Sequence, residues 1–272
     1  MLNVGIIGCG AIGSQICKSF DADENRNINI HAIYDHNTDY VSSIINQLKS
    51  MEPKILSLDE MVREVDLIVE TASQRAVRSI AIPALKAKCD VLIMSVGALA
   101  EDKLRNDIYA LATQNNCKVY LPSGSIAGID GIKSAMSGDI QSITLKTKKP
   151  PAGLKDAPYI IEQGINLDKI DSETIIFEGS ALNAVNAFPA NVNVAATLSI
   201  AGIGFEKTKV QIIADPKLTM NVHEIEVLGE FGKICSRIEN KPSPKNPKTS
   251  HLASLSAIST LRKIAEPVQV GT

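Results

Sequence analysis

The chain has 272 residues, enough for one large domain or two of ordinary size. Hydrophobic residues make up 44% of it and charged residues 21%, as in most globular proteins that work in water. Its 28 basic and 30 acidic side chains give a formal net charge of -2, which argues against nucleic acid or an anionic membrane as a partner.

Signals for membranes and secretion are missing from the sequence pattern. No apolar run reaches the roughly 18 residues needed to cross a bilayer, and the first apolar stretch lacks the basic leader of a signal peptide. The five cysteines are scattered and include no C-x-x-C pair. We therefore expect a cytoplasmic protein with reduced thiols, no disulfide framework and no metal site.

A glycine motif near the start is the strongest functional signal. After an apolar strand, Gly8, Gly10 and Gly13 follow in the spacing G-x-G-x-x-G, and a helix begins at Ala11. In dinucleotide-binding domains such glycines allow a tight turn, close approach of the pyrophosphate, and close packing of helix on strand. The first helical N–H groups, including those of Ala11 and Ile12, would then face the phosphates.

Asp35 completes this motif at the end of a second apolar strand, 28–34. A carboxylate about 20 residues beyond the last glycine is placed to bind the adenosine ribose. It would repel a 2′-phosphate, so NAD is favoured over NADP, while His36 and Asn37 leave use of both open. A turn of small residues followed by a solvated aspartate is the alternative, which the order strand, glycines, helix, strand and aspartate disfavours.

Strands and helices continue to alternate as far as residue 122. Strands are predicted at 54–56, 66–70, 90–94 and 118–121, and helices at 39–49, 58–63, 73–86 and 101–115. Pro83 should bend or split the third of these helices. This alternation predicts an α/β Rossmann domain with a doubly wound parallel sheet. Ligands bind at the carboxyl ends of such strands, which places Ala72 and Ala98 in loops beside the cofactor.

The pattern changes in the second half of the chain, where apolar residues recur with period two. Strands are predicted at 140–149, 174–177, 207–214, 218–228 and 232–238, and helices at 131–136, 192–200 and 250–264. These predict a second α+β domain with a mixed or antiparallel sheet. A polar loop at 240–248 precedes the last helix, which we expect to return to the first domain, although a tail on the second domain would show the same pattern. The expected domains are 1–122 with 246–272, and 123–245.

His223 is the most informative residue of the second domain. In its strand His223 shares a face with Ile225 and Val227, whereas the intervening glutamates point the other way. A histidine on an apolar face is either a core residue with a satisfied ring or a site residue, and the pattern leaves both readings open.

Three other stretches could contact ligands. Asn191 or Asn193 could cap the helix at 192–200, which leaves the second asparagine for a ligand. The glycine-rich segment that contains Ser123 and Ala127 could hold a carboxylate or line the nicotinamide, or serve only as a hinge. The basic cluster around Lys148 could be a solvated face or could supply a cation for a dicarboxylate substrate.

The chain resembles the L-aspartate dehydrogenase family over nearly its whole length. The motifs that carry the resemblance are 4–13, 94–99, 123–128, 188–196, the His223 strand and 246–250. The resemblance implies a Rossmann domain, a second domain that helps to form a homodimer, and a terminal helix that returns to the first domain. It also implies that His223 is the active-site histidine and that Ala127 and Asn193 contact the cofactor. Residues 146–151 depart from the family pattern, which has an arginine before the lysine and prolines, and this puts the role of Lys148 in doubt.

The activity that the resemblance implies is NAD(P)-dependent oxidative deamination of L-aspartate. The product iminoaspartate would give oxaloacetate and ammonia, or pass into NAD biosynthesis. His223, with an ordinary histidine pKa of about 6.5, could take the proton that the substrate ammonium must lose. Two alternatives stay open: a related two-domain enzyme of the homoserine dehydrogenase or dihydrodipicolinate reductase type, and a nucleotide sensor without activity.

Overall fold

The structure, a computed structural model, describes residues 1–23, 27–189, 192–243 and 246–271. The chain divides into two units. The first comprises Met1–Pro122 and Ala253–Gln269, and the second comprises Ser123–Leu252 and Val270–Thr272.

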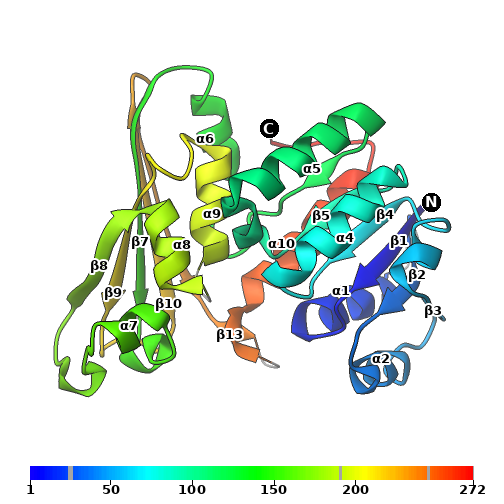
Figure 1. The fold of residues 1–272 in the computed structure, drawn as a ribbon, viewed down its shortest axis with the longest axis horizontal. Coiled ribbons are helices and arrows are strands. Elements are labelled where there is room, and N and C mark those ends of the chain that lie inside the picture. The colour runs from blue at the N-terminus through cyan, green and yellow to red at the C-terminus, as the bar shows by residue number, and fades with distance from the viewer. Residues whose placement is uncertain (24–26, 190–191, 244–245, 272) are drawn as a thin grey trace. The chain divides into compact units, whose positions relative to one another are not determined.

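A six-stranded sheet organises the first unit (Figure 1). Its strands are β1 (Leu2–Ile7), β2 (Ile28–Tyr34), β3 (Lys54–Ile55), β4 (Leu67–Glu70), β5 (Asp90–Ile93) and β6 (Val119–Tyr120). They lie in the order β3-β2-β1-β4-β5-β6, and every neighbouring pair is parallel. The predicted doubly wound parallel sheet is therefore confirmed, and the loops after β1, β2, β4 and β5 leave the same edge.

Helices cover this sheet. They are α1 (Ala11–Asp21), α2 (Thr38–Ile45), α3 (Leu58–Met61), α4 (Gln74–Lys86), α5 (Asp102–Asn115) and α10 (His251–Ala265). In Figure 1, α4 and α5 run side by side across the sheet. Pro83 lies inside α4, which continues as one helix to Lys86, so of the two expected effects, a bend or a split, the split does not occur.

The last helix, α10, belongs to the first unit. Ala257, Ile258 and Leu261 of α10 are buried in one apolar cluster with Ile16 and Phe20 of α1, together with residues of β1 and β2. Burial of this stripe removes apolar surface from water, the main favourable term in helix docking. The predicted return of the terminal helix is confirmed.

The helix predicted at 39–49 ends early, at Ile45. The reason is Asp21, at the end of α1. Its carboxylate accepts hydrogen bonds of 2.8 Å from the backbone N–H groups of Lys49, Ser50 and Met51. These N–H groups therefore bind a side chain instead of extending the helix, a contact between segments nearly 30 residues apart that periodicity does not reveal.

A mixed five-stranded sheet organises the second unit. Its strands are β7 (Ile140–Lys149), β8 (Thr174–Ser180), β9 (Lys209–Ala214), β10 (Asn221–Gly229) and β11 (Gly232–Asn240). They lie in the order β11-β10-β7-β9-β8, with β7 and β9 parallel and the other pairs antiparallel. The α helices of this unit are α6 (Ile129–Ala135), α7 (Pro158–Glu162), α8 (Ala181–Ala187) and α9 (Val192–Ala201). The predicted mixed sheet is confirmed.

One face of this sheet is buried and the other is polar. Ile143, Leu145, Ile225 and Val227 all point to the buried face. The end of α9 lies on this face, since a Cβ on Gly202 would come within 2.3 Å of the Ile143 side chain. A side chain at this position would therefore have to displace Ile143.

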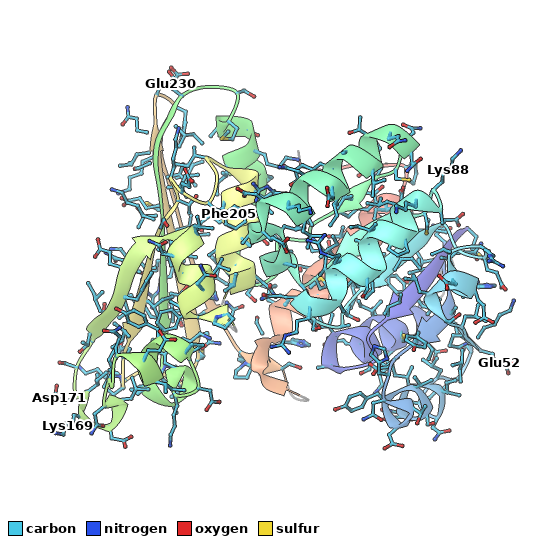
Figure 2. All side chains as sticks on the ribbon, viewed as in Figure 1. Glu52, Lys88, Lys169, Asp171, Phe205 and Glu230 are labelled. Carbon is cyan, nitrogen blue, oxygen red and sulfur yellow. The ribbon has the colours of Figure 1, made fainter. Side chains whose placement is uncertain are left out.

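Labelled residues mark the two ends of this sheet in Figure 2. Glu230, in the turn between β10 and β11, marks one end, and Lys169 and Asp171 lie at the other. Because β7 and β10 are antiparallel, the last residues of β7 and the first residues of β10 lie together at the end away from Glu230.

Two features of the second unit differ from the sequence prediction. The short helices α7 and α8 were not predicted, and the stretch expected to be a polar loop forms part of a two-stranded sheet, β12 (Pro242–Ser243) with β13 (Asn246–Ser250). No helix in the described part of the chain combines the length and apolar character that crossing a bilayer requires.

Candidate active site

The three motif glycines of the first unit differ in the space that surrounds them. Gly8 has φ +105°, and a Cβ there would lie 2.5 Å from the backbone of Thr71. A Cβ on Gly13 would lie 2.0 Å from the Gly8 oxygen, so α1 and β1 approach too closely for any side chain. A Cβ on Gly10 would meet no atom within 4 Å. The fold therefore requires Gly8 and Gly13, while the space at Gly10 lies open.

This open space fits a dinucleotide. Gly10 is the N-cap of α1, so the N–H groups of Ala11 and Ile12 lie in the first turn of a helix. The first four N–H groups of a helix have no partner within it and carry the positive end of its dipole. A pyrophosphate could approach the backbone at Gly10 and accept these hydrogen bonds.

Asp35 is joined to the glycine loop. Its Oδ2 accepts a hydrogen bond of 2.7 Å from the backbone N–H of Cys9, and its Oδ1 accepts one of 2.8 Å from Asn37. The carboxylate is partly exposed, so it retains acceptor capacity for ribose hydroxyls. The structure thus brings Asp35 and the glycines together at the carboxyl edge of the sheet.

Glu70 holds the next two loops of this edge. It is fully buried at the end of β4, and its Oε1 accepts hydrogen bonds from the N–H of Ala72 at 2.8 Å and the hydroxyl of Ser95 at 2.9 Å. Its Oε2 accepts one from the N–H of Ser95 at 2.9 Å. Burial raises the pKa of this carboxyl, against the lowering effect of these hydrogen bonds.

The loops that Glu70 joins are those in which cofactor contacts were predicted. Ala72 is exposed directly beyond Glu70, and the N–H of Ala98 bonds to the carbonyl of Ser95 at 3.0 Å. Sequence reasoning identified the loops but missed the carboxylate that links them.

His223 lies at the start of β10, on the buried face of the second sheet. Only 5% of it is exposed, and it stands opposite Thr147 of β7. Its Nδ1 is 3.1 Å from the Thr147 hydroxyl oxygen. Burial, and then the positive charge of Lys149, lower its pKa to about 3 instead of the expected value near 6.5. His223 is thus both buried and hydrogen-bonded, and its ring is neutral at neutral pH.

The lysines at the end of β7 separate onto the two faces of the sheet. The ammonium of Lys148, on the polar face, forms ion pairs with Glu173 at 3.0 Å and Glu224 at 3.5 Å. Lys149 points to the same buried face as His223 and is only 8% exposed. Lys148, the lysine selected from the predicted cluster of Lys146, Lys148 and Lys149, is therefore on the opposite face from His223, whereas Lys149 of the same cluster is on the face of His223.

The glycine-rich segment that contains Ser123 and Ala127 is held by two side chains. Asn240, buried at the end of β11, donates to the carbonyl of Ser125 at 3.0 Å. The Ser236 hydroxyl donates to the carbonyl of Ala127 at 3.2 Å. Ser123 is partly exposed and Ala127 is exposed, so both are accessible within the second unit.

Of the two asparagines that could cap α9 or contact a ligand, the structure describes one. Asn193, the second residue of this helix, is exposed. Asn191, the alternative cap, lies outside the described residues.

Comparisons with known proteins identify the family. Residues 130–264 match the family described as "Aspartate dehydrogenase, C-terminal", and residues 8–122 match "Homoserine dehydrogenase, NAD binding domain". The L-aspartate dehydrogenase of Methanosarcina acetivorans is 56% identical over 272 residues, which cover 100% of both chains. The chain belongs to the L-aspartate dehydrogenase family. A more distant member, from Nitrosopumilus maritimus, is 42% identical over 275 residues and is also covered completely.

Solved structures agree with membership of the L-aspartate dehydrogenase family. The crystal structure of aspartate dehydrogenase from Thermotoga maritima matches with a TM-score of 0.76 and 28% identity, covering 100% of both chains. A scyllo-inositol dehydrogenase from Lactobacillus casei, solved with NAD(H), matches with a TM-score of 0.57 at 15% identity, covering 100% of this chain and 91% of the other, which shows a shared fold only. The predicted family is confirmed, as is the predicted class of enzyme, an oxidoreductase that uses a pyridine nucleotide.

Proposed function

We propose that this chain oxidises L-aspartate to iminoaspartate, with NAD preferred to NADP. The full-length identity of 56% to an L-aspartate dehydrogenase carries the proposal. Iminoaspartate then gives oxaloacetate and ammonia by hydrolysis, or enters NAD biosynthesis. The open glycine loop of the first unit and the buried imidazole of the second are consistent with this reaction.

The first unit would supply most of the cofactor contacts. The proposed contacts are Gly8, Gly10, Ala11, Ile12, Gly13, Asp35, Ala72 and Ala98 from this unit, with Ala127 and Asn193 from the second. When bound, the nicotinamide accepts a hydride from the substrate carbon that bears the amine. The helix N-terminus would bind the phosphates and Asp35 the ribose.

Asp35 underlies the proposed preference for NAD. A carboxylate in this position accepts hydrogen bonds from ribose hydroxyls and repels a 2′-phosphate. We expect Asp35→Asn to raise kcat/KM for NADP relative to NAD, since asparagine can still accept the bond from Cys9 but carries no charge. Asp39→Asn, which removes a carboxylate from the first turn of α2, is the matched control. An unchanged cofactor ratio in Asp35→Asn would count against this role.

His223 would remove the proton that the substrate ammonium must lose before hydride transfer. In one tautomer Nδ1–H donates to the Thr147 hydroxyl, and the Nε2 lone pair is then available as the acceptor. A neutral imidazole is the form that can accept a proton, and burial keeps His223 in that form. The nearby charge of Lys149 opposes protonation of the ring, so a carboxylate beside Lys149 would make His223 a stronger base.

Ser123 is a second proposed contact of the substrate, through its hydroxyl or the N–H groups of its segment. Lys148 is a weaker candidate, because Glu173 and Glu224 already neutralise its charge.

The decisive experiment mixes the purified protein with NAD and L-aspartate and follows the absorbance of the reduced nicotinamide. Turnover that prefers L-aspartate to homoserine supports the proposal. Turnover of homoserine alone would indicate a related dehydrogenase, and NADH binding without turnover of any amino acid would indicate a sensor. His223→Ala should lower kcat by about 100-fold or more while NADH still binds. His31→Ala, which removes a surface partner of Glu64, should leave kcat unchanged.

We also propose that the enzyme is a cytoplasmic homodimer. All five cysteines are free thiols, which suits a reducing compartment. The polar face of the second sheet is open over β10 and β11 and could pair with a second copy of the chain. Light scattering on the eluting protein would give the mass, and a mass equal to one chain would exclude the dimer.

A further inference from the structure

Lys149 is the most unusual charged residue of the second unit. Lysine is rarely buried, because an ammonium loses its hydration there. Yet Lys149 is 8% exposed, at the end of a strand whose other buried residues on that face are Ile143, Leu145 and Thr147.

The turn after β7 lies beside the stem of this lysine. The turn Pro151–Leu154 follows β7, and a Cβ on Gly153 would lie 3.7 Å from Cδ and 3.8 Å from Cβ of Lys149. The backbone carbonyl of Lys149 accepts a hydrogen bond of 2.9 Å from the N–H of Asp215, at the end of the parallel strand β9. The backbone bond fixes where the side chain begins, and the turn lies beside its stem.

The same face carries His223. Because His223 stands opposite Thr147, Lys149 is its diagonal neighbour across the β7–β10 ladder. Diagonal neighbours have Cα atoms about 7 to 8 Å apart, which long side chains can bridge. Both side chains extend from the same face of the sheet, so one small dicarboxylic amino acid bound between their ends could present its amine to the imidazole and a carboxylate to the ammonium.

We propose that Lys149 binds a carboxylate of the substrate beside His223 and thereby selects dicarboxylic amino acids. This inference rests on the proposed function, since His223 marks the reacting end. A substrate carboxylate and this ammonium would form a charge-assisted hydrogen bond, which is strong in a site sheltered from water. Lys148 has its two glutamates on the other face and does not compete for this role.

The test uses binding of succinate, a dicarboxylate without an amine, to the full-length protein in the presence of NADH. Lys149→Met keeps the length of the stem and removes the charge, and an apolar side chain suits a buried position. We expect its Kd for succinate and its KM for L-aspartate to rise about 10- to 100-fold, with the Kd for NADH unchanged. The preference for succinate over butyrate should fall by a similar factor, which a purely structural role would not produce.

Lys146→Met is the matched control. Lys146 is on the same strand but is exposed on the opposite face, so this variant should bind succinate as the wild type does. If Lys149→Met does not fold, Lys149→Gln provides the same neutral comparison. Lys149→Arg keeps the charge and should retain more succinate binding than either neutral variant.

The outcomes separate this inference from the proposed function. If the wild type oxidises L-aspartate and the neutral Lys149 variants keep its Kd for succinate and its KM, the inference is overturned and the function stands. If the wild type does not oxidise L-aspartate but its succinate binding depends on Lys149, the proposed function fails and a dicarboxylate site remains. If the neutral variants lose succinate binding and L-aspartate activity together, both are supported.

Discussion

The Thr147 hydroxyl lies 3.1 Å from Nδ1 of His223, across the ladder that joins β7 to β10. Both residues are buried, and they stand directly opposite each other in the register. A neutral imidazole has two tautomers, and a fixed partner at one nitrogen determines the state of the other. We therefore propose that Thr147 positions His223 for its proposed role, which can be tested separately.

Thr147→Val should lower kcat for L-aspartate by about 5- to 10-fold, the loss expected for one buried hydrogen bond worth about 1 kcal/mol. Valine has nearly the same shape, so the Kd for NADH should stay the same. Thr144→Val, on the opposite face of β7, is the control. Equal kcat values for the wild type and Thr147→Val would show that the hydroxyl does not orient the imidazole.

The pKa of His223 predicts how stability depends on pH. Its pKa is about 3 in the folded chain and about 6.5 in the unfolded chain, so the unfolded chain binds the proton first as the pH falls. The contribution of His223 to the free energy of unfolding is therefore fully present above about pH 6.5 and is lost progressively towards about pH 3. Between about pH 7.5 and about pH 5, the wild type should lose about 2 kcal/mol more free energy of unfolding than His223→Asn. Urea denaturation at both pH values measures this, and parallel losses would contradict the low pKa.

The alternation of residues along β7 predicted its two faces but not the roles of its lysines. Period two places Lys149 on the face of Thr147, and this signal was present in the sequence. The basic run before two prolines predicts a single cluster, so by itself it does not distinguish Lys148 from Lys149. The contacts that separate them, with Glu173 and Glu224, come from other strands and loops, and no local pattern shows them.

The same limit applies to buried polar side chains that join distant segments. Glu70 closes a predicted strand, yet its partner Ser95 lies 25 residues further along the chain. Asn240 was assigned to a polar loop, although it is buried with its Oδ1 accepting a 2.7 Å bond from Ser250. By contrast, the start of α8 has a local sequence signal, because serine is a preferred N-cap residue. In the structure the Ser180 hydroxyl accepts a hydrogen bond from the N–H of Asn183, as an N-cap does.

Gly10 and Gly13 should respond differently to the same substitution. Gly13→Ala places a methyl group 2.0 Å from the Gly8 carbonyl oxygen and should lower the free energy of unfolding by about 1 to 3 kcal/mol. Gly10→Ala meets no protein atom within 4 Å, so its stability should stay within about 0.5 kcal/mol of the wild type. Its Kd for NADH should rise about tenfold or more, because the methyl group occupies the approach of the pyrophosphate. Equal NADH affinity in Gly10→Ala and the wild type would place the phosphates elsewhere.

Glu70 should be needed for both stability and cofactor binding. Its two oxygens accept hydrogen bonds from the N–H groups of Ala72 and Ser73 and from the N–H and hydroxyl of Ser95. In Glu70→Gln the amide nitrogen cannot accept, so at least one N–H faces another donor. Each buried donor left without an acceptor costs about 1 to 3 kcal/mol, and we expect a loss of that size in the free energy of unfolding. The same change should raise the Kd for NADH several-fold, because both loops that we propose to contact the nucleotide lose their common anchor.

Glu101→Gln is the matched control for this prediction, since Glu101 is exposed and pairs with Arg78 at the surface. Exposed ion pairs contribute little, so this variant should match the wild type in both measurements. Urea denaturation and NADH fluorescence titration on the same preparations distinguish the two effects. If Glu70→Gln loses stability but binds NADH as tightly as Glu101→Gln does, the carboxylate supports the fold alone and does not position the loops for the cofactor.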